Sequence, residues 1–263
     1  MTAVRLTHVG GPTVLIEAAG WRLLTDPTFD PPGETYHFGF GSSSTKVVGP
    51  TVAAADVGPL DAILLTHDHH DDNLDHAGRE LLPSAGVVVT TASGAGRLGG
   101  ETRGLHAWES TRLEAEGRSA LEVTATPCRH GPSLSHPLVG DVVGFALRWD
   151  GQEHGVLWIS GDTVLYDGVR EVADRLEVGL ALLHVGGAQF GVTGPVHYTM
   201  TGRDAVELVD LARPHTAIPV HYEGWSHFKD GRDGVERALA AAPEDVRQRF
   251  RWVPIGEAVE LTA

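Results

Sequence analysis

The chain lacks several of the residues and segments on which whole protein classes depend. It has 263 residues, and Cys128 is its only cysteine. A single thiol excludes an intramolecular disulfide and a structural zinc site built from cysteines. No window is long and apolar enough for a transmembrane helix, and residues 1–18 alternate like a strand, unlike a signal peptide. These absences predict a cytoplasmic protein with no membrane partner.

Positive charge is also scarce. The 20 lysines and arginines stand against 35 aspartates and glutamates, which gives a formal net charge of −15 at pH 7. Lys46 and Lys229 are the only lysines, and the arginines form no basic stripe. Because phosphate binding needs basic residues, this balance argues against nucleic acid as a partner. The expected partner is a small-molecule substrate, and the sequence leaves a homo-oligomer open.

A dense group of histidines and aspartates follows one of the apolar runs. Residues 63–66 lead directly into His67-Asp68-His69-His70-Asp71-Asp72. If the strand continues, alternate side chains share a face, so His67 and His69 point at one ion and His70 lies opposite. Neutral imidazole suits zinc and similar metals, so the group predicts a metal site. Solvated loop histidines at an ordinary polar strand end are the competing interpretation.

Three more ligand-type residues follow apolar runs of the chain. They are His130, Asp162 and His221. Neighbouring strand ends lie along one edge of a sheet, so these side chains can meet the first group in one crevice. The sequence alone leaves that convergence open.

The order of the predicted elements indicates layers of sheet and helix. Strands are expected at residues 4–8, 13–17, 21–25, 60–66, 87–91, 110–115, 120–126, 142–149, 156–160, 180–185 and 216–220. Helices are expected from residue 73 and at residues 166–176, 202–212 and 233–250. Because helices must cover sheet faces, two sheets flanked by outer helices are the economical arrangement. No internal repeat or low-complexity linker occurs, so residues 1–263 are expected to form one domain.

The segment from Asp26 to Pro50 has no clear period and carries several aromatic residues. Loops of this length in compact domains are usually functional or disordered, and the aromatic residues argue against disorder. We expect a loop that covers the substrate, with plain surface packing as the alternative.

The order of these motifs resembles the signature of the metallo-β-lactamase superfamily. That signature is His-x-His-x-Asp-His, followed by a distant histidine, a distant aspartate and a final histidine. The similarity runs from the Thr25-Asp26-Pro27 turn to His221. Its spacing resembles the branch that contains ascorbate-phosphate lactonases and N-acylphosphatidylethanolamine phospholipase D. The resemblance implies an α/β (α+β) fold, the four-layer αββα sandwich.

The resemblance also implies one or two bound divalent ions, with zinc as the first choice and manganese or iron as alternatives. The implied ligands of one ion are His67, His69 and His130. The implied ligands of the second are Asp71, His221 and the bridging Asp162.

Asp72 stands where the signature has histidine, and three interpretations are open. It ligates the second ion, which would favour manganese or iron over zinc alone. It caps the following helix and leaves the second site weak. Or the second site is lost and one ion remains.

The function implied by the resemblance is a metal-dependent hydrolase. The metal activates water as hydroxide and polarises a carbonyl or phosphoryl oxygen. Asp71 and Asp162 are candidates to orient the hydroxide and relay its proton. His197 and His184 are candidates to donate to a developing oxyanion, with ordinary packing as the alternative.

The expected substrate is a lactone or another carboxylic ester or amide. A phosphodiesterase of the same fold is the runner-up. A metal-binding or sensing protein without turnover is a third hypothesis, which Asp72 favours.

Overall fold

Two β-sheets lie face to face in the computed structural model, which describes residues 3–39, 41–133, 135 and 139–263. The first sheet contains β1 (Ala3–Gly10), β2 (Thr13–Ala18), β3 (Trp21–Thr25), β6 (Leu60–Leu64), β7 (Ala85–Thr91), β8 (Thr102–Leu105) and β15 (Ala258–Thr262). The second contains β9 (Ser110–Leu113), β10 (Leu121–Pro127), β11 (Val143–Arg148), β12 (Val156–Ile159), β13 (Val178–His184) and β14 (Thr216–Val220). Their strand orders are β15-β1-β2-β3-β6-β7-β8 and β14-β13-β12-β11-β10-β9.

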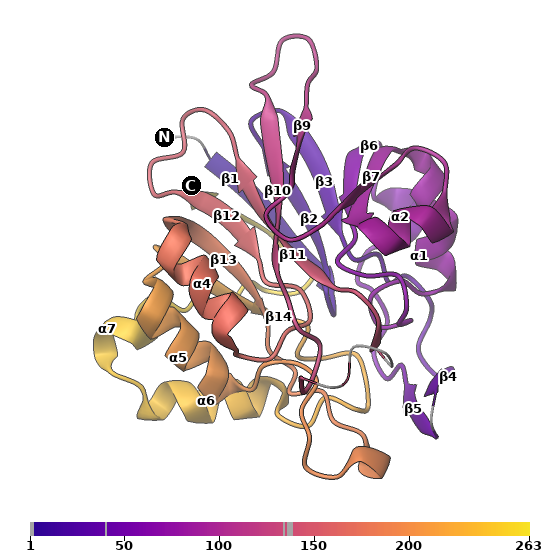
Figure 1. Cartoon of the computed structure of the whole chain (residues 1–263), viewed down its shortest axis with the longest axis vertical. Helices are drawn as coiled ribbons and strands as arrows, with labels where there is room; N and C mark the ends of the chain where they lie inside the picture. The colour runs from indigo at the N-terminus through magenta and orange to yellow at the C-terminus, as the bar shows by residue number, and fades with distance from the viewer. Residues whose placement is uncertain (1–2, 40, 134, 136–138) are drawn as a thin grey trace.

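Helices cover the outer face of each sheet (Figure 1). Those on the first sheet are α1 (His76–Leu81) and α2 (Ala92–Leu98). Those on the second are α4 (Asp167–Arg175), α5 (Gly202–Ala212), α6 (Gly231–Ala241) and α7 (Glu244–Arg247). Short 3₁₀ turns are η1 (Ala54–Asp56), η2 (Leu82–Ser84) and η3 (Gly191–Thr193). Among the described residues, no helix is long and apolar enough to cross a membrane.

Three apolar cores separate the four layers. The central core lies between the sheets and includes Leu64 and Phe145. A second core lies between the six-stranded sheet and its helices, around Trp158. The third lies on the outer face of the seven-stranded sheet and includes Ile63. Ile63 and Leu64 are neighbours in β6 and enter different cores, because successive side chains of a strand point to opposite faces. The predicted αββα sandwich is confirmed.

Most of the predicted elements are present, with shifted ends. The strand β14 and the helix α5 have the predicted bounds, and the last helix breaks at Pro243 into α6 and α7. The helix expected from residue 73 begins only at His76, because the carboxylate of Asp75 accepts a hydrogen bond from Gly78 N and is the N-cap. The prediction that Asp72 caps this helix is therefore wrong.

The segment from residue 26 to 50 contains a hairpin of β4 (Thr35–Gly39) and β5 (Ser42–Thr45). Just after β5, the buried Lys46 forms an ion pair with the buried Asp75 at 2.8 Å. The same carboxylate accepts hydrogen bonds from the backbone N–H groups of Phe29 and Asp30. These bonds fix both ends of the segment to the start of α1.

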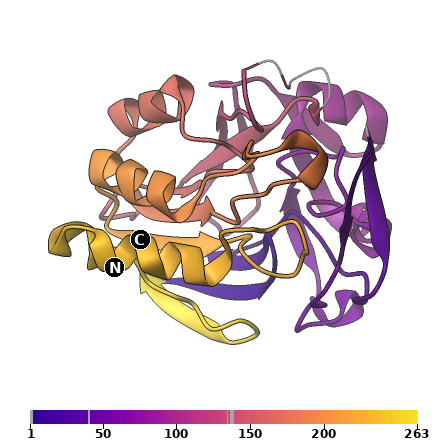
Figure 2. The same ribbon diagram turned by 90° about the horizontal axis from the view of Figure 1, so that it is seen from below.

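One end of the sandwich collects the strand ends that precede the ligand-type residues. Parallel pairing of β12, β13 and β14 brings the residues after Ile159, His184 and Val220 to the same edge. Both views place the β4–β5 hairpin and η3 at one end of the molecule (Figure 1, Figure 2).

Close packing of α1 against the turn after β3 gives the first prediction. A Cβ atom on Gly78 would lie 1.9 Å from the carbonyl oxygen of Pro27. We expect Gly78→Ala to lower the free energy of unfolding by roughly 1 to 3 kcal/mol, because the backbone must move. Urea unfolding followed by circular dichroism measures it.

The matched control is Gly96→Ala in α2, where a Cβ would meet nothing within 4 Å. Alanine stabilises an exposed helix by about 1 kcal/mol relative to glycine, so this variant should be at least as stable as the parent. Equal losses in both variants would contradict the packing argument.

Candidate metal centre

The chain turns out of strand geometry just after β6. Asp26, with a φ of 30°, directs its Oδ1 at Thr66 and accepts from Thr66 N at 2.7 Å and Thr66 Oγ1 at 2.9 Å. The Oγ1 of Thr66 lies 3.0 Å from Nδ1 of His67. Since the hydroxyl donates to Asp26, it accepts from the imidazole, which leaves Nε2 of His67 as an unprotonated ligand atom.

Three histidines form the first group of ligand atoms. Nδ1 of His70 lies 3.3 Å from Nε2 of His67 and 3.1 Å from Nε2 of His130. The Nδ1 of His130 is held at 2.8 Å by the carbonyl oxygen of Tyr198, so its Nε2 also carries a lone pair. One proton on His70 can satisfy only one of these lone pairs, whereas a cation among the three nitrogens would satisfy all of them.

Burial keeps His67 and His70 of the first group neutral. Desolvation, with help from neighbouring His70 and His130, lowers the pKa of His67 well below its ordinary value. Burial and the nearby His130 lower the pKa of His70 to about 3. Neutral imidazoles are the form that binds a metal, so no proton must leave at neutral pH.

The second group surrounds Asp162. Its Oδ1 accepts from Nδ1 of His184 at 2.8 Å and from Nδ1 of His221 at 2.7 Å. Burial would raise the pKa of Asp162, but His221 and the two hydrogen bonds bring that pKa well below its ordinary value. Nε2 of His221 lies 3.7 Å from Oδ2 of Asp72, so Asp72 joins this group.

Unpaired buried atoms show that the residues fit a bound metal. Four atoms of the second group are buried and have no hydrogen-bond partner within the described part of the chain: Asp72 Oδ1, Asp162 Oδ2, His184 Nε2 and His221 Nε2. Buried polar atoms without partners are costly and uncommon, and a divalent cation would satisfy several at once. Imidazole and carboxylate donors without thiolate suit zinc, manganese or iron.

The structure corrects the register expected in the motif. His69 is exposed, with Nδ1 3.6 Å from Oδ1 of Asp68, and its ring packs on Gly140. His70, and not His69, is the buried histidine that lies beside His67. The expectation that His67 and His69 share a face is wrong because β6 ends at Leu64, and the following chain is not extended.

Asp71 and His197 also lie outside both groups. Asp71 is half-buried, and burial together with Asp72 raises its pKa. The Nδ1 of His197 lies 3.4 Å from the carbonyl oxygen of Gly187, and its ring lines a separate hollow beside Arg203. Of the predicted site residues, the structure brings together His67, Asp72, His130, Asp162 and His221.

Three histidines of the site were missed or misplaced by sequence reasoning. His70 was expected on the opposite side of the strand from His67. In a chain that is not extended, residues three positions apart can face the same ion. His184 was a candidate oxyanion donor and not a ligand, and its place at the end of β13 was its only signal. His227 had no signal of its own, and its Nε2 lies 3.1 Å from Oδ2 of Asp72.

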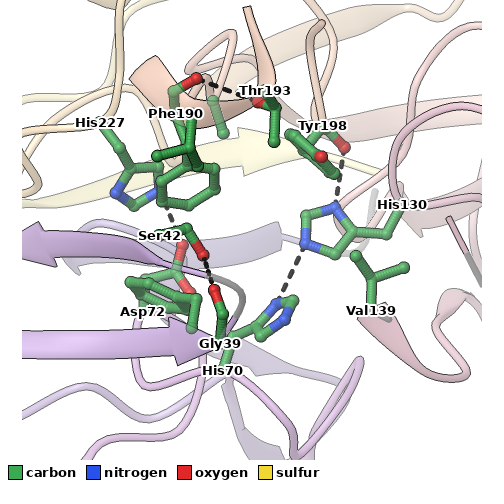
Figure 3. Close-up of a pocket in the computed structure, with 13 residues that line it drawn as sticks. Gly39, Ser42, His70, Asp72, His130, Val139, Phe190, Thr193, Tyr198 and His227 are labelled. Carbon is green, nitrogen blue, oxygen red and sulfur yellow. Dashed lines mark hydrogen bonds and ion pairs between the residues drawn. The ribbon is translucent and has the colours of Figure 1, made fainter. Parts of the chain in front are cut away.

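A cavity of about 70 Å³ opens beside the histidines (Figure 3). The metal-type side chains that line it are His70, Asp72, His130 and His227. The apolar walls include Phe38 of the β4–β5 hairpin and Phe190 and Val192 around η3. Phe38 packs edge-on against His70 at 5.4 Å between ring centroids. The hairpin therefore covers the site. It belongs to the segment from residue 26 to 50, in which a substrate-covering loop was expected.

Comparisons with known proteins agree with this geometry. Residues 21–222 match the family model described as the beta-lactamase superfamily domain. A UPF0173 metal-dependent hydrolase of Deinococcus radiodurans is 34% identical over 225 residues, which is 83% of this chain and 84% of the relative. A UPF0173 metal-dependent hydrolase of Pelotomaculum thermopropionicum is 27% identical, over 98% of this chain and 100% of the relative.

Solved structures share the fold over nearly the whole chain. An isothiocyanate hydrolase from Delia radicum gut bacteria superposes with a TM-score of 0.82 at 20% identity, covering 98% of this chain and 100% of that one. Igni18, a metallo hydrolase from Ignicoccus hospitalis, superposes with a TM-score of 0.71 at 20% identity, covering 99% of each chain. At such identities these structures show a common fold.

The corrected register gives a direct test of the first group. We expect His70→Ala to lose roughly one divalent ion per chain, because it removes a nitrogen that faces both His67 and His130. His69→Ala is the matched control and should keep the parent's metal content. Elemental analysis after dialysis against zinc measures both. Loss in His69→Ala with retention in His70→Ala would restore the alternating register.

Proposed function

Because the chain belongs to the beta-lactamase superfamily and is a metal-dependent hydrolase of it, we propose that it hydrolyses small neutral substrates of the lactone, carboxylic ester or amide class. When bound, divalent ions supply an acidified water and a Lewis acid for the carbonyl oxygen. The chain's own residues hold those ions, orient the water and surround the substrate.

The lining of the cavity carries the choice of a neutral substrate. Among its described lining residues there is no lysine or arginine, and Phe38, Phe190 and Val192 make the walls apolar. A phosphodiester would bring a negative charge next to the carboxylate of Asp72, and beyond the bound ions it would find no cationic side chain among the described lining residues to offset that charge.

Two cationic residues lie near the site segments in the sequence, Lys46 in the segment from residue 26 to 50 and Arg129 directly before His130, and both are engaged elsewhere. Lys46 forms its ion pair with Asp75. The guanidinium of Arg129 lies over the ring of Tyr166 at 4.4 Å. Neither is among the residues that line the cavity, so the structure favours neutral esters over the phosphodiester alternative.

Asp72 takes the water-orienting role that the sequence assigned to Asp71 or Asp162. It is the carboxylate that lines the cavity, and its Oδ1 has no hydrogen-bond partner. The pKa of Asp72 lies below its ordinary value, because the bond and charge of His227 outweigh the effect of burial. An ionised carboxylate at this position can accept a hydrogen bond from an attacking water and orient it. Asp162, bound to two imidazoles, holds the second group in place instead.

A substrate panel tests this proposal. Purified protein loaded with zinc or manganese is assayed with a γ-lactone, p-nitrophenyl acetate, bis-p-nitrophenyl phosphate and an alkyl isothiocyanate. The last is included because one protein of similar fold is named an isothiocyanate hydrolase. We expect turnover of the neutral substrates and little or none of the phosphodiester.

Chelation and His221→Ala should each lower the activity by more than about a hundredfold. Substitution of a residue that only holds a metal ligand already costs about ten- to a hundredfold in metal affinity or activity, and loss of a ligand or of the metal should cost more. His154→Ala is the control, since this histidine stacks on His215 and lines no part of the cavity. Metal binding without turnover of any substrate would overturn the proposal and favour the sensing protein. A preference for the phosphodiester would overturn the neutral specificity.

A further inference from the structure

We propose that His227, on the loop after β14, supplies to the second ion the histidine that the motif lacks. This inference rests on the proposed metal-dependent function, and it further assumes that the chain binds two ions. Its evidence lies in the register of the motif and in the surroundings of the His227 ring.

The corrected register removes the motif's last histidine altogether. Counted onward from His70, Asp72 takes the place of the signature aspartate, and Asn73 takes the place of the histidine that follows it. The Nδ2 of Asn73 lies 3.5 Å from Oγ1 of Thr66. Zinc is bound by imidazole, thiolate and carboxylate in preference to amides. The motif therefore supplies no histidine to the second ion, and any histidine added to His184 and His221 comes from another segment.

His227 lies where such a ligand is needed. It is 3% exposed, and its Nε2 is 3.1 Å from Oδ2 of Asp72. The same oxygen is 3.7 Å from Nε2 of His221. Ligands at 2.0–2.2 Å from a tetrahedral ion lie about 3.4 Å from one another, so these spacings suit donors around one ion. The Asp72 carboxylate thus lies between two imidazoles in a ligand-like arrangement.

The anchoring of the His227 ring matches that of His67 and His130. In each of those two, a protein oxygen holds Nδ1, and Nε2 faces the group. The Nδ1 of His227 is held at 2.6 Å by Oγ of Ser44. Such a bond fixes the orientation of a metal-binding imidazole.

Packing further restrains the ring. It stacks on Phe190 with centroids 5.0 Å apart and an interplanar angle of 12°. The backbone carbonyl of His227 accepts from Gln189 N at 3.0 Å. The ring is therefore held in position before any ion binds, which lowers the entropic cost of binding.

A simpler role for His227 would be to hold Asp72 by a hydrogen bond. Two substitutions separate the roles. His227→Ala removes both ligand and hydrogen bond, whereas His227→Gln keeps an amide that can donate to Asp72 but is a poor zinc ligand. His197→Ala is the matched control, because that nearby histidine lines a different hollow.

Zinc per chain is measured by elemental analysis and by calorimetric titration, with thermal unfolding as the check on folding. We expect roughly two ions in the parent and in His197→Ala, and roughly one in both His227 variants. Two ions in His227→Ala, or two restored in His227→Gln, would overturn the proposal. A single ion in the parent would overturn it as well, while hydrolysis of the neutral substrates would leave the proposed function standing.

Discussion

The hydrogen bonds between Asp26 and Thr66 determine how the rest of the site is built. Asp26 is wholly buried, and burial raises its pKa well above the ordinary value, so its bonds to Thr66 form away from solvent. Hydrogen bonds are electrostatically stronger in such a place than in water. They end the extended path of β6 and fix the tautomer of His67 through the Thr66 hydroxyl. The turn places His70, three residues after His67, in the first group and leaves His69 outside.

The same geometry concentrates unpaired polar atoms where a cation can bind them. A chain that buries Asp72, Asp162 and His221 without partners for all their atoms loses stability unless something compensates. Divalent ions that bind the folded chain and not the unfolded chain supply that compensation. They thereby couple metal affinity to folding. The formal charge of −15 overstates the charge of the metal-loaded protein for the same reason.

Regular elements were predictable from the sequence because their signals are local. The bounds of α5 follow from Thr201, whose side chain and that of Asp204 form a capping box. The register of the motif was not predictable, because it depends on a contact between residues 40 positions apart, Asp26 and Thr66. His227 was further out of reach, since its neighbours Asp72 and Ser44 lie 155 and 183 positions away. The apolar runs pointed to the strand-end residues His130, Asp162 and His221, and the family resemblance implied their ligand roles but could not supply a residue outside the signature.

The two halves of the site have different origins, and His227 connects them. The strand ends supply the metal-type residues, whereas the cavity walls come from the β4–β5 hairpin and the segment around η3. Ser44 of the hairpin holds His227, and Phe190 near η3 stacks on it. A shift of the hairpin would therefore move a side chain bonded to Asp72 together with Phe38 of the wall. Because both depend on one hairpin, substitutions chosen to change the substrate at Phe38 should be judged on metal content as well as on turnover.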